Sequence, residues 1–133
     1  MIQDYDFSCY VIKFEKVSIN RRKYKKDSIQ NENHSIVPLI NNHQHFDPES
    51  VVGRAVLEMR DDGIFVYGTL TDTPYKKVII DLINDGELYL SPFINKVKMD
   101  SEYITNGIIS EVSLVLARID PDDCYKPILK EKE

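Results

Sequence analysis

Two apolar runs joined by a short turn place the strongest constraint on what this chain can fold into. Residues 51–59 and 64–70 are rich in aliphatic and aromatic side chains, and the turn-forming sequence Arg-Asp-Asp-Gly occupies 60–63. This pattern predicts a β-hairpin. Gly53 and Gly68 lie inside the two strands, where glycine marks a bend or a close backbone approach. We therefore expect a strongly curved sheet of the kind that closes into a barrel.

Three further segments have the composition and alternation of strands. Residues 7–17 open the sheet, residues 88–99 form a strand in the second half of the chain, and residues 108–118 form the last one. Pro92 cannot donate a ladder hydrogen bond, so it predicts that its strand lies at an edge or is interrupted there. The expected sheet is curved and mostly antiparallel.

One helix is predicted over about 74–85. Thr73 suits the N-cap, Pro74 suits the first helical position, and Gly86 suits the position just past the end. A single apolar stripe at helical spacing is expected to pack on the core; it consists of Tyr75, Val78, Ile79, Leu82 and Ile83. Strands, one helix and then strands indicate the α+β class.

The 133 residues with 42% apolar content suffice for one domain, which we expect over 1–120. Residues 18–35 are polar and predict a mobile loop that is dispensable for folding, and residues 121–133 predict a polar C-terminal tail. The expected core consists of Tyr10, Ile12, Val37, Leu39, Val56, Phe65, Val78, Ile79, Leu82, Leu90, Val112 and Leu114.

Charge argues against nucleic acid as a partner. Lys and Arg number 17 against 22 Asp and Glu, so the net charge is −5, and the basic run at 21–26 is typical of a solvated loop. No apolar run approaches the about 20 residues of a membrane span, and the acidic start predicts no signal peptide. Cys9 and Cys124 have no metal-binding or redox spacing, which favours a reducing cytosol.

Three residues on separate elements have the chemistry of a serine nucleophile with its base. His43 follows an apolar run that ends in two asparagines, Ser91 lies in the strand after the helix, and Glu111 lies in the last strand. A serine hydroxyl needs a neighbouring base, and that base works best when a third group orients it. Each residue also has an ordinary structural interpretation, since a loop histidine, a strand serine and a surface glutamate are common.

These residues allow two other interpretations. His43 and His45 have the spacing of two metal ligands on one side of a strand, but no third ligand is evident beyond His34 and Glu49. We expect no metal and no cofactor. Ser113 shares a face with Glu111 and is a rival nucleophile, although serines in central strands more often serve packing.

The ordered set of motifs resembles the prohead proteases of tailed phages. The matching segments are Pro-Leu-Ile-Asn-Asn-His at 38–43, Val-Gly-Arg-Ala at 52–55, the helix that leads through Leu88 to Ser91, and Ile-Ser-Glu-Val-Ser-Leu-Val at 109–115. The resemblance covers about 36–120. It implies a herpesvirus-protease-like β-barrel with a serine endopeptidase site, in which His43 is the base, Ser91 the nucleophile and Glu111 the third member.

The same resemblance implies a function in capsid maturation. Such an enzyme cleaves scaffold and capsid-protein segments within assembling proheads in the host bacterial cytoplasm, and it self-associates as herpesvirus relatives do. One departure is clear: Pro92 and Phe93 follow Ser91, where the family has a small apolar residue and glycine. An inactive relative that acts as an assembly or scaffolding component is therefore an alternative, and a small metal-dependent hydrolase is a second.

Overall fold

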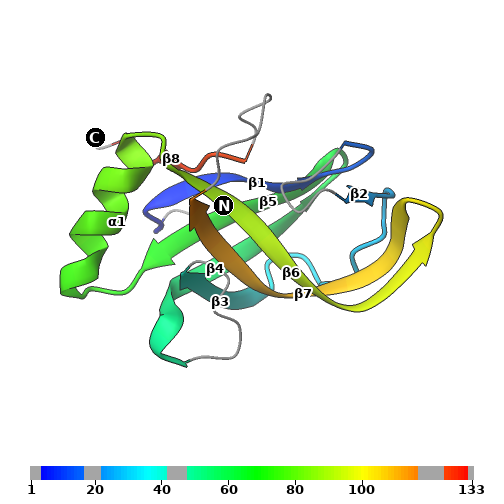
Figure 1. Ribbon diagram of the computed structural model, residues 1–133, viewed down its shortest axis with the longest axis horizontal. Coiled ribbons are helices and arrows are strands. Elements are labelled where there is room, and N and C mark those ends of the chain that lie inside the picture. The colour runs from blue at the N-terminus through cyan, green and yellow to red at the C-terminus, as the bar shows by residue number, and fades with distance from the viewer. Residues whose placement is uncertain (1–3, 17–21, 42–47, 117–124, 132–133) are drawn as a thin grey trace.

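The computed structural model describes residues 4–16, 22–41, 48–116 and 125–131. One helix and a curled sheet make up this part of the chain, which belongs to the α+β class as expected (Figure 1). The elements are β1 Phe7–Lys13, β2 Lys23–Tyr24, β3 Ile36–Asn41, the 3-10 turn η1 Pro48–Ser50, β4 Val51–Arg60, β5 Gly63–Leu70, α1 Pro74–Asn84, β6 Leu88–Asp100, β7 Tyr103–Leu116 and β8 Ile128–Leu129.

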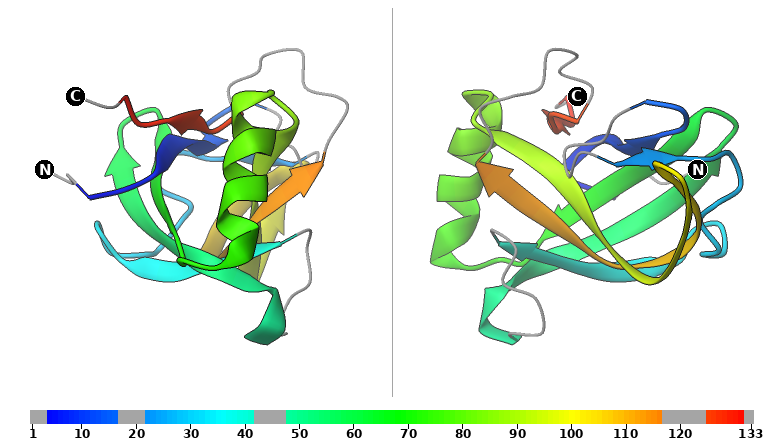
Figure 2. Two further views of the ribbon diagram at one scale, coloured as in Figure 1. Left: turned by 90° about the vertical axis from the view of Figure 1, so that its left-hand side faces the viewer. Right: turned by 45° about the vertical axis from the view of Figure 1, so that its right-hand side comes forward.

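The eight strands form one sheet that curls into a partial barrel (Figure 2). Its order is β2-β7-β3-β4-β5-β1-β8, and β6 also pairs with β7. The pairs β2–β7 and β3–β7 are parallel, and the other strand pairs are antiparallel. The predicted hairpin is β4–β5. A Cβ atom at Gly68 would overlap the ring of Phe7, so the expected close approach is confirmed there.

A segment near the C-terminus joins the two ends of this curl, which corrects the expectation of a polar tail over 121–133. The ring of Tyr125 is fully buried. Its carbonyl oxygen accepts a hydrogen bond from the Leu90 N–H of β6 at 2.8 Å and one from the Cys9 Sγ of β1 at 3.5 Å. Beyond it, β8 pairs with β1. For the described residues 125–131 the tail prediction was wrong, because one large aromatic side chain outweighs its polar neighbours.

The described part of the predicted mobile loop, residues 22–35, also contributes to the fold. Tyr24 of β2 and Ile29 are buried in the core. The Asn31 side chain replaces a strand: its Nδ2 donates to the Ile109 carbonyl at 3.0 Å, and its Oδ1 accepts from the Ile109 N–H at 2.7 Å. The polar composition of this segment predicted a dispensable loop. The Asn31 side-chain amide nevertheless makes the pair of hydrogen bonds to the Ile109 backbone that a neighbouring strand would make, and a polar residue gives no sign of this in the sequence.

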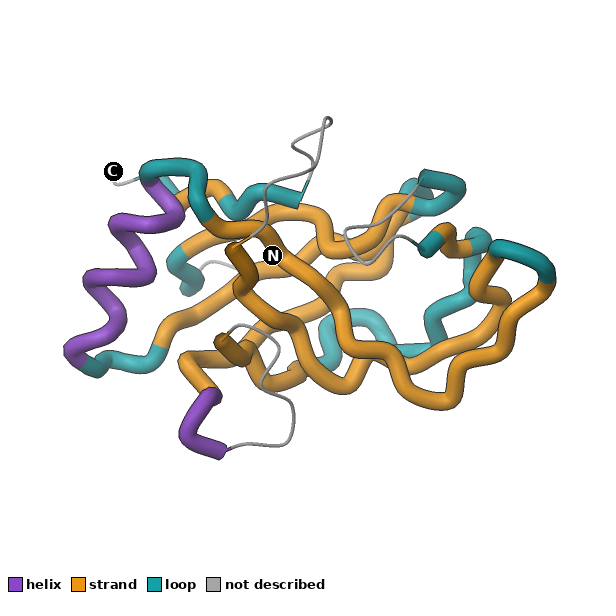
Figure 3. The backbone as a smooth tube through the Cα atoms, in the orientation of Figure 1, coloured by secondary structure: helices purple, strands orange, loops and turns teal. Residues whose placement is uncertain are grey.

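Helix α1 lies across one end of the partial barrel (Figures 1 and 3). Thr73 and Pro74 begin it as predicted. At its end Gly86 has φ +74°, the Gly86 N–H donates to Ile83 O and the Glu87 N–H donates to Leu82 O, each at 3.0 Å. This pair of bonds is a Schellman motif, which satisfies carbonyls that the helix leaves open.

The apolar stripe of the helix is narrower than predicted. Ile79 and Ile83 are buried and Leu82 is half-buried against the core, but Tyr75 is 71% exposed and Val78 is 56% exposed. The helix meets the sheet along one side only, so residues a quarter turn away remain in solvent. Helical spacing cannot distinguish these two sides when both carry apolar residues.

The expected core is confirmed in part. Buried members are Ile12, Val37, Leu39, Ile79, Leu90, Val112 and Leu114; half-buried members are Tyr10, Val56, Phe65 and Leu82; Val78 is exposed. Tyr10, Val56 and Phe65 were misplaced because they lie on the outer face of their strands. Tyr10 and Ile12 are two residues apart and would normally share a face of β1. The register shift between them places them on different faces.

Candidate active site

Strands β6 and β7 bring the predicted nucleophile and its rival together. Ser91 of β6 lies directly opposite Ser113 of β7, between the pairs Leu90–Leu114 and Pro92–Val112. Leu90, Leu114 and Val112 belong to the main core. Because strand side chains alternate, the two serines point to the other face of the sheet. Each is 1% exposed.

Glu111 shares this face with the serines. It lies opposite Phe93, two residues from Ser113 along β7, and so is the diagonal neighbour of Ser91. Such neighbours are about 7–8 Å apart, within reach of a long side chain. The Glu111 side chain belongs to a residue that is only 7% exposed. The predicted nucleophile and acid therefore lie on one face of one strand pair.

Strand β3 lies beside β7 on its other edge and ends at the same place. Ile40 pairs with Ser113 and Asn41 pairs with Leu114, both in parallel register. Ile40, Ser113 and Ser91 thus form one row across three strands. The next residues along the chain are Asn42 and the predicted base His43. Both lie outside the described residues, as does His45.

The backbone of β6 beside Ser91 is part of the seam of the barrel. The Leu90 N–H points away from β7, since it donates to Tyr125 O at 2.8 Å. By the alternation of an antiparallel pair, Pro92 also presents its nitrogen side away from β7, where no ladder bond is lost. The expectation of an edge position for Pro92 is therefore confirmed. The same proline supplies no N–H for an oxyanion.

The described ranges contain no group of three His, Cys, Asp or Glu side chains that could hold a metal ion. His34 and Glu49, the two further candidates for a metal site, are exposed. The His34 N–H donates to Leu57 O at 2.7 Å, which fixes its backbone to β4. Among these same residues, no helix has the length and apolar character that crossing a membrane requires.

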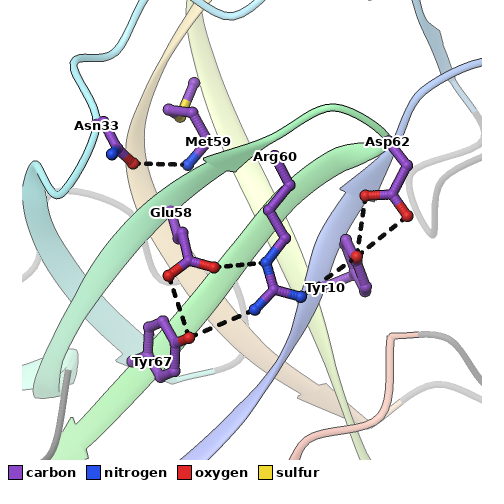
Figure 4. Close-up of polar contacts among 7 residues, drawn as sticks. All are labelled: Tyr10, Asn33, Glu58, Met59, Arg60, Asp62 and Tyr67. Carbon is purple, nitrogen blue, oxygen red and sulfur yellow. Dashed lines mark hydrogen bonds and ion pairs between the residues drawn. The ribbon is translucent and has the colours of Figure 1, made fainter. Parts of the chain in front are cut away.

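A second polar cluster, which the sequence did not reveal, lies on the outer face of β1, β4 and β5 (Figure 4). The Arg60 guanidinium donates to the Glu58 carboxylate, and more weakly to the hydroxyls of Tyr10 and Tyr67 at 3.4 Å each. The Tyr67 hydroxyl donates to Glu58 Oε2 at 3.1 Å, and the Tyr10 hydroxyl donates to Asp62 at 2.9 Å. The signal available was a pair of opposite charges two residues apart, Glu58 and Arg60, next to a strand that carries Phe65 and Tyr67.

The two charges of this cluster stabilise each other. Partial burial acts to raise the pKa of Glu58, but the hydrogen bond and charge of Arg60 outweigh it, so that pKa lies below its ordinary value. Burial raises the pKa of the Tyr67 hydroxyl. The cluster is thus held as an ion pair with a neutral phenol, an arrangement that suits structure more than proton transfer.

Comparison with protein families, with curated proteins and with solved structures finds no match to this chain. The resemblance to prohead proteases therefore stays a prediction from the motifs.

Proposed function

We propose that this chain is a serine endopeptidase of the prohead-protease kind, with Ser91 as nucleophile, His43 as base and Glu111 as the residue that orients the base. The observation that carries the proposal is the common face of Ser91 and Glu111 on β6 and β7. These residues are 20 positions apart in the sequence, and the register makes them diagonal neighbours.

The spacing of the two residues suits one imidazole ring between them. A hydroxyl and a carboxylate that share an imidazole are separated by two hydrogen bonds of about 2.6–3.2 Å and by the width of the ring. Diagonal neighbours at about 7–8 Å leave that room. Ser113 shares this face and lies two residues from Glu111 on β7, so the order of the motifs, with Ser91 directly after the helix, is what assigns the nucleophile to Ser91.

The course of β3 supports the assignment of His43. This strand ends beside the serine row, and His43 follows its last residue, Asn41, by two positions. Asn41, the last described residue of β3, pairs with Leu114, so the chain leaves the sheet one residue beyond the serine row, and the end of a rigid strand is a common place for reactive groups. The chemistry uses side chains alone and needs no metal or cofactor.

The substrates that the resemblance implies are scaffold and capsid-protein segments inside assembling proheads of a bacterial host. A herpesvirus-protease-like fold is part of the same proposal, since the partial barrel with one helix agrees with it at the coarser level. Ser91 is buried, so a substrate peptide can reach it only after residues that cover it move aside. An enzyme that acts only within an assembled particle gains from such closure.

Co-expression with candidate scaffold and capsid proteins tests the proposal. Ser91→Ala and His43→Ala should each abolish cleavage, and the double variant should be no worse than either, since the residues act as a unit. Ser113→Ala is the matched control, with the same residue type, face and burial. It should retain cleavage.

Glu111→Gln should reduce cleavage less than Ser91→Ala, because an amide keeps part of the geometry but loses the charge that stabilises the imidazolium. Full activity of Ser91→Ala, or loss of activity in Ser113→Ala alone, would contradict the assignment of the nucleophile.

A non-enzymatic role in assembly is the second candidate, and Pro92 favours it. The proline removes a backbone donor next to Ser91 that an oxyanion could use. Labelling with a fluorophosphonate separates the two functions when it is performed on assembled proheads. Labelling of Ser91 supports the enzyme, whereas proheads that assemble only with this chain present, without labelling or cleavage, support the assembly role.

A further inference from the structure

The side chains of β7 change face at one residue. Ile109 and Val112 both belong to the main core, although residues three positions apart in a regular strand point to opposite faces. The register explains the change, because Glu111 pairs with Phe93 and Ile109 pairs with the next residue of β6. Ser110 therefore has no partner on β6. This is a β-bulge, an extra residue in one strand of an antiparallel pair.

The bulge decides which way Glu111 points. In a regular strand Glu111 would share the face of Ile109, since residues two apart lie on the same side. Its carboxylate would then enter the main core, where a charge among apolar side chains is costly. With the bulge, Glu111 shares the face of Ser91 instead. Bulges beside active sites commonly re-aim a side chain in this way.

The side-chain amide of Asn31 holds the backbone directly before the bulge. Its Nδ2 donates to the Ile109 carbonyl at 3.0 Å, and its Oδ1 accepts from the Ile109 N–H at 2.7 Å. On this edge of β7, a bridge at Gly107 lies before Ile109, and the pairing with β3 begins only at Val112. Asn31 thus fills the interval between two backbone contacts.

We propose that Asn31 is a positioning residue for Glu111. The inference rests on the proposed function, in which Glu111 orients the base. Glu111 lies between two fixed points of β7. Val112 is held by its pairing with β3 and β6, and Ile109 is held by Asn31. The bulge interrupts the ladder to β6 between these points, so the hydrogen bonds of Asn31 limit how far the bulged backbone moves.

An amide suits this task because it carries one donor group and one acceptor side by side, as the backbone of a strand does. It therefore satisfies both the N–H and the carbonyl of Ile109, and alanine at this position would satisfy neither. Asn31 lies on the edge of β7 opposite β6, the strand that carries Ser91. It acts on Glu111 through the backbone of β7 and not through contact with a substrate.

Steady-state cleavage of a candidate scaffold protein by the purified chain tests the proposal. Asn31→Ala should lower kcat by about 10- to 100-fold with little change in KM, because a misplaced Glu111 affects the chemical step and not substrate binding. Asn31→Gln keeps an amide and should lose less. Asn33→Ala is the matched control, since the Asn33 Oδ1 accepts from the Met59 N–H of β4 at 2.9 Å, and it should keep the wild-type kcat.

A double-mutant cycle separates positioning from a general loss of stability. In a Glu111→Ala background, Asn31→Ala should lower kcat by less than about twofold, since no carboxylate is left to misplace. Hydrogen exchange of the amides at 109–111 gives a readout without substrate. It should be faster in Asn31→Ala than in the wild type and unchanged in Asn33→Ala.

The outcomes distinguish this inference from the proposed function. An equal fall of kcat in both backgrounds, unchanged exchange at 109–111, or wild-type kcat in Asn31→Ala while Ser91→Ala is inactive would overturn the inference alone. Absence of cleavage by the wild-type chain, or undiminished cleavage by Ser91→Ala, would overturn the proposed function and this inference with it.

Discussion

At the scale of single residues, Arg60 holds the outer face of the sheet together. Its guanidinium has five N–H donors in a fixed plane. These donate to the Glu58 carboxylate on β4 and to the hydroxyls of Tyr67 on β5 and Tyr10 on β1. The same plane covers the face of Phe65. Lysine could not replace it, because one ammonium cannot reach these acceptors from a stacked position.

The lowered pKa of Glu58 predicts how stability depends on pH. A group whose pKa is lower in the folded state stabilises the fold above its ordinary pKa of about 4.3, and this contribution is lost as the pH falls through the folded value. Glu58→Gln should therefore lower the free energy of unfolding at pH 7, and the difference from the wild type should shrink below about pH 4.3.

Urea denaturation at several pH values measures this dependence. The same substitution in an Arg60→Met background is the control, since the pH-dependent difference should be small once the cation is absent. A difference between Glu58→Gln and the wild type that grows in acid would show that the carboxyl is destabilised in the folded state.

At the scale of elements, the helix shows how one side of an amphipathic segment is chosen. Ile79 and Ile83 are buried, whereas Val78, which directly precedes Ile79, is exposed. The side of the helix that becomes buried is set by how the helix lies across the end of the sheet (Figure 2). Intrinsic propensity and capping determine where the helix begins and ends, but not which apolar residues it buries.

Two alanine substitutions on this helix should differ sharply. Ile83→Ala should lower the free energy of unfolding by about 2–5 kcal/mol, because it leaves a cavity at the helix–sheet contact. Val78→Ala should change it by no more than about 0.5 kcal/mol, as at other exposed sites. Chemical denaturation measures both, and equal losses would show that the exposed side is packed in solution.

The sequence predicted the elements better than their faces. Caps and turns are local signals, and they located α1 and the β4–β5 hairpin correctly. Burial failed at Tyr10 and Phe65 because apolar residues occupy both faces of β1 and β5, so alternation alone cannot identify the inner one. The nearness of Ser91 to Glu111 depends on the β6–β7 register, which no single strand reveals.

At the scale of the whole molecule, the partial barrel is joined across its open side by Tyr125. Tyr125 forms a second, smaller buried cluster together with Tyr89 and Val115. The half-buried Tyr10 packs against this cluster. The Tyr125 carbonyl links β6 to β1, the strands on the two sides of the gap. The seam runs beside Leu90, the neighbour of Ser91.

Tyr125→Ala should therefore cost more than a substitution elsewhere in the same segment. Loss of a fully buried aromatic side chain should lower the free energy of unfolding by about 3–5 kcal/mol. Ile128→Ala, on the exposed side of β8, should change it by about 0.5 kcal/mol or less. A thermal melt of both variants checks the contrast, and a small effect of Tyr125→Ala would show that the seam closes by other means.

The dependence of this seam on a distant residue has a consequence for the nascent chain. During synthesis, β1 and β6 are complete well before Tyr125 is added, so their backbone groups at the gap have no partner in the meantime. Unpaired strand edges are templates for pairing with other chains, and the growing protein is therefore most prone to aggregate in that interval. Chaperones that shield strand edges would matter most there, before the finished domain is formed.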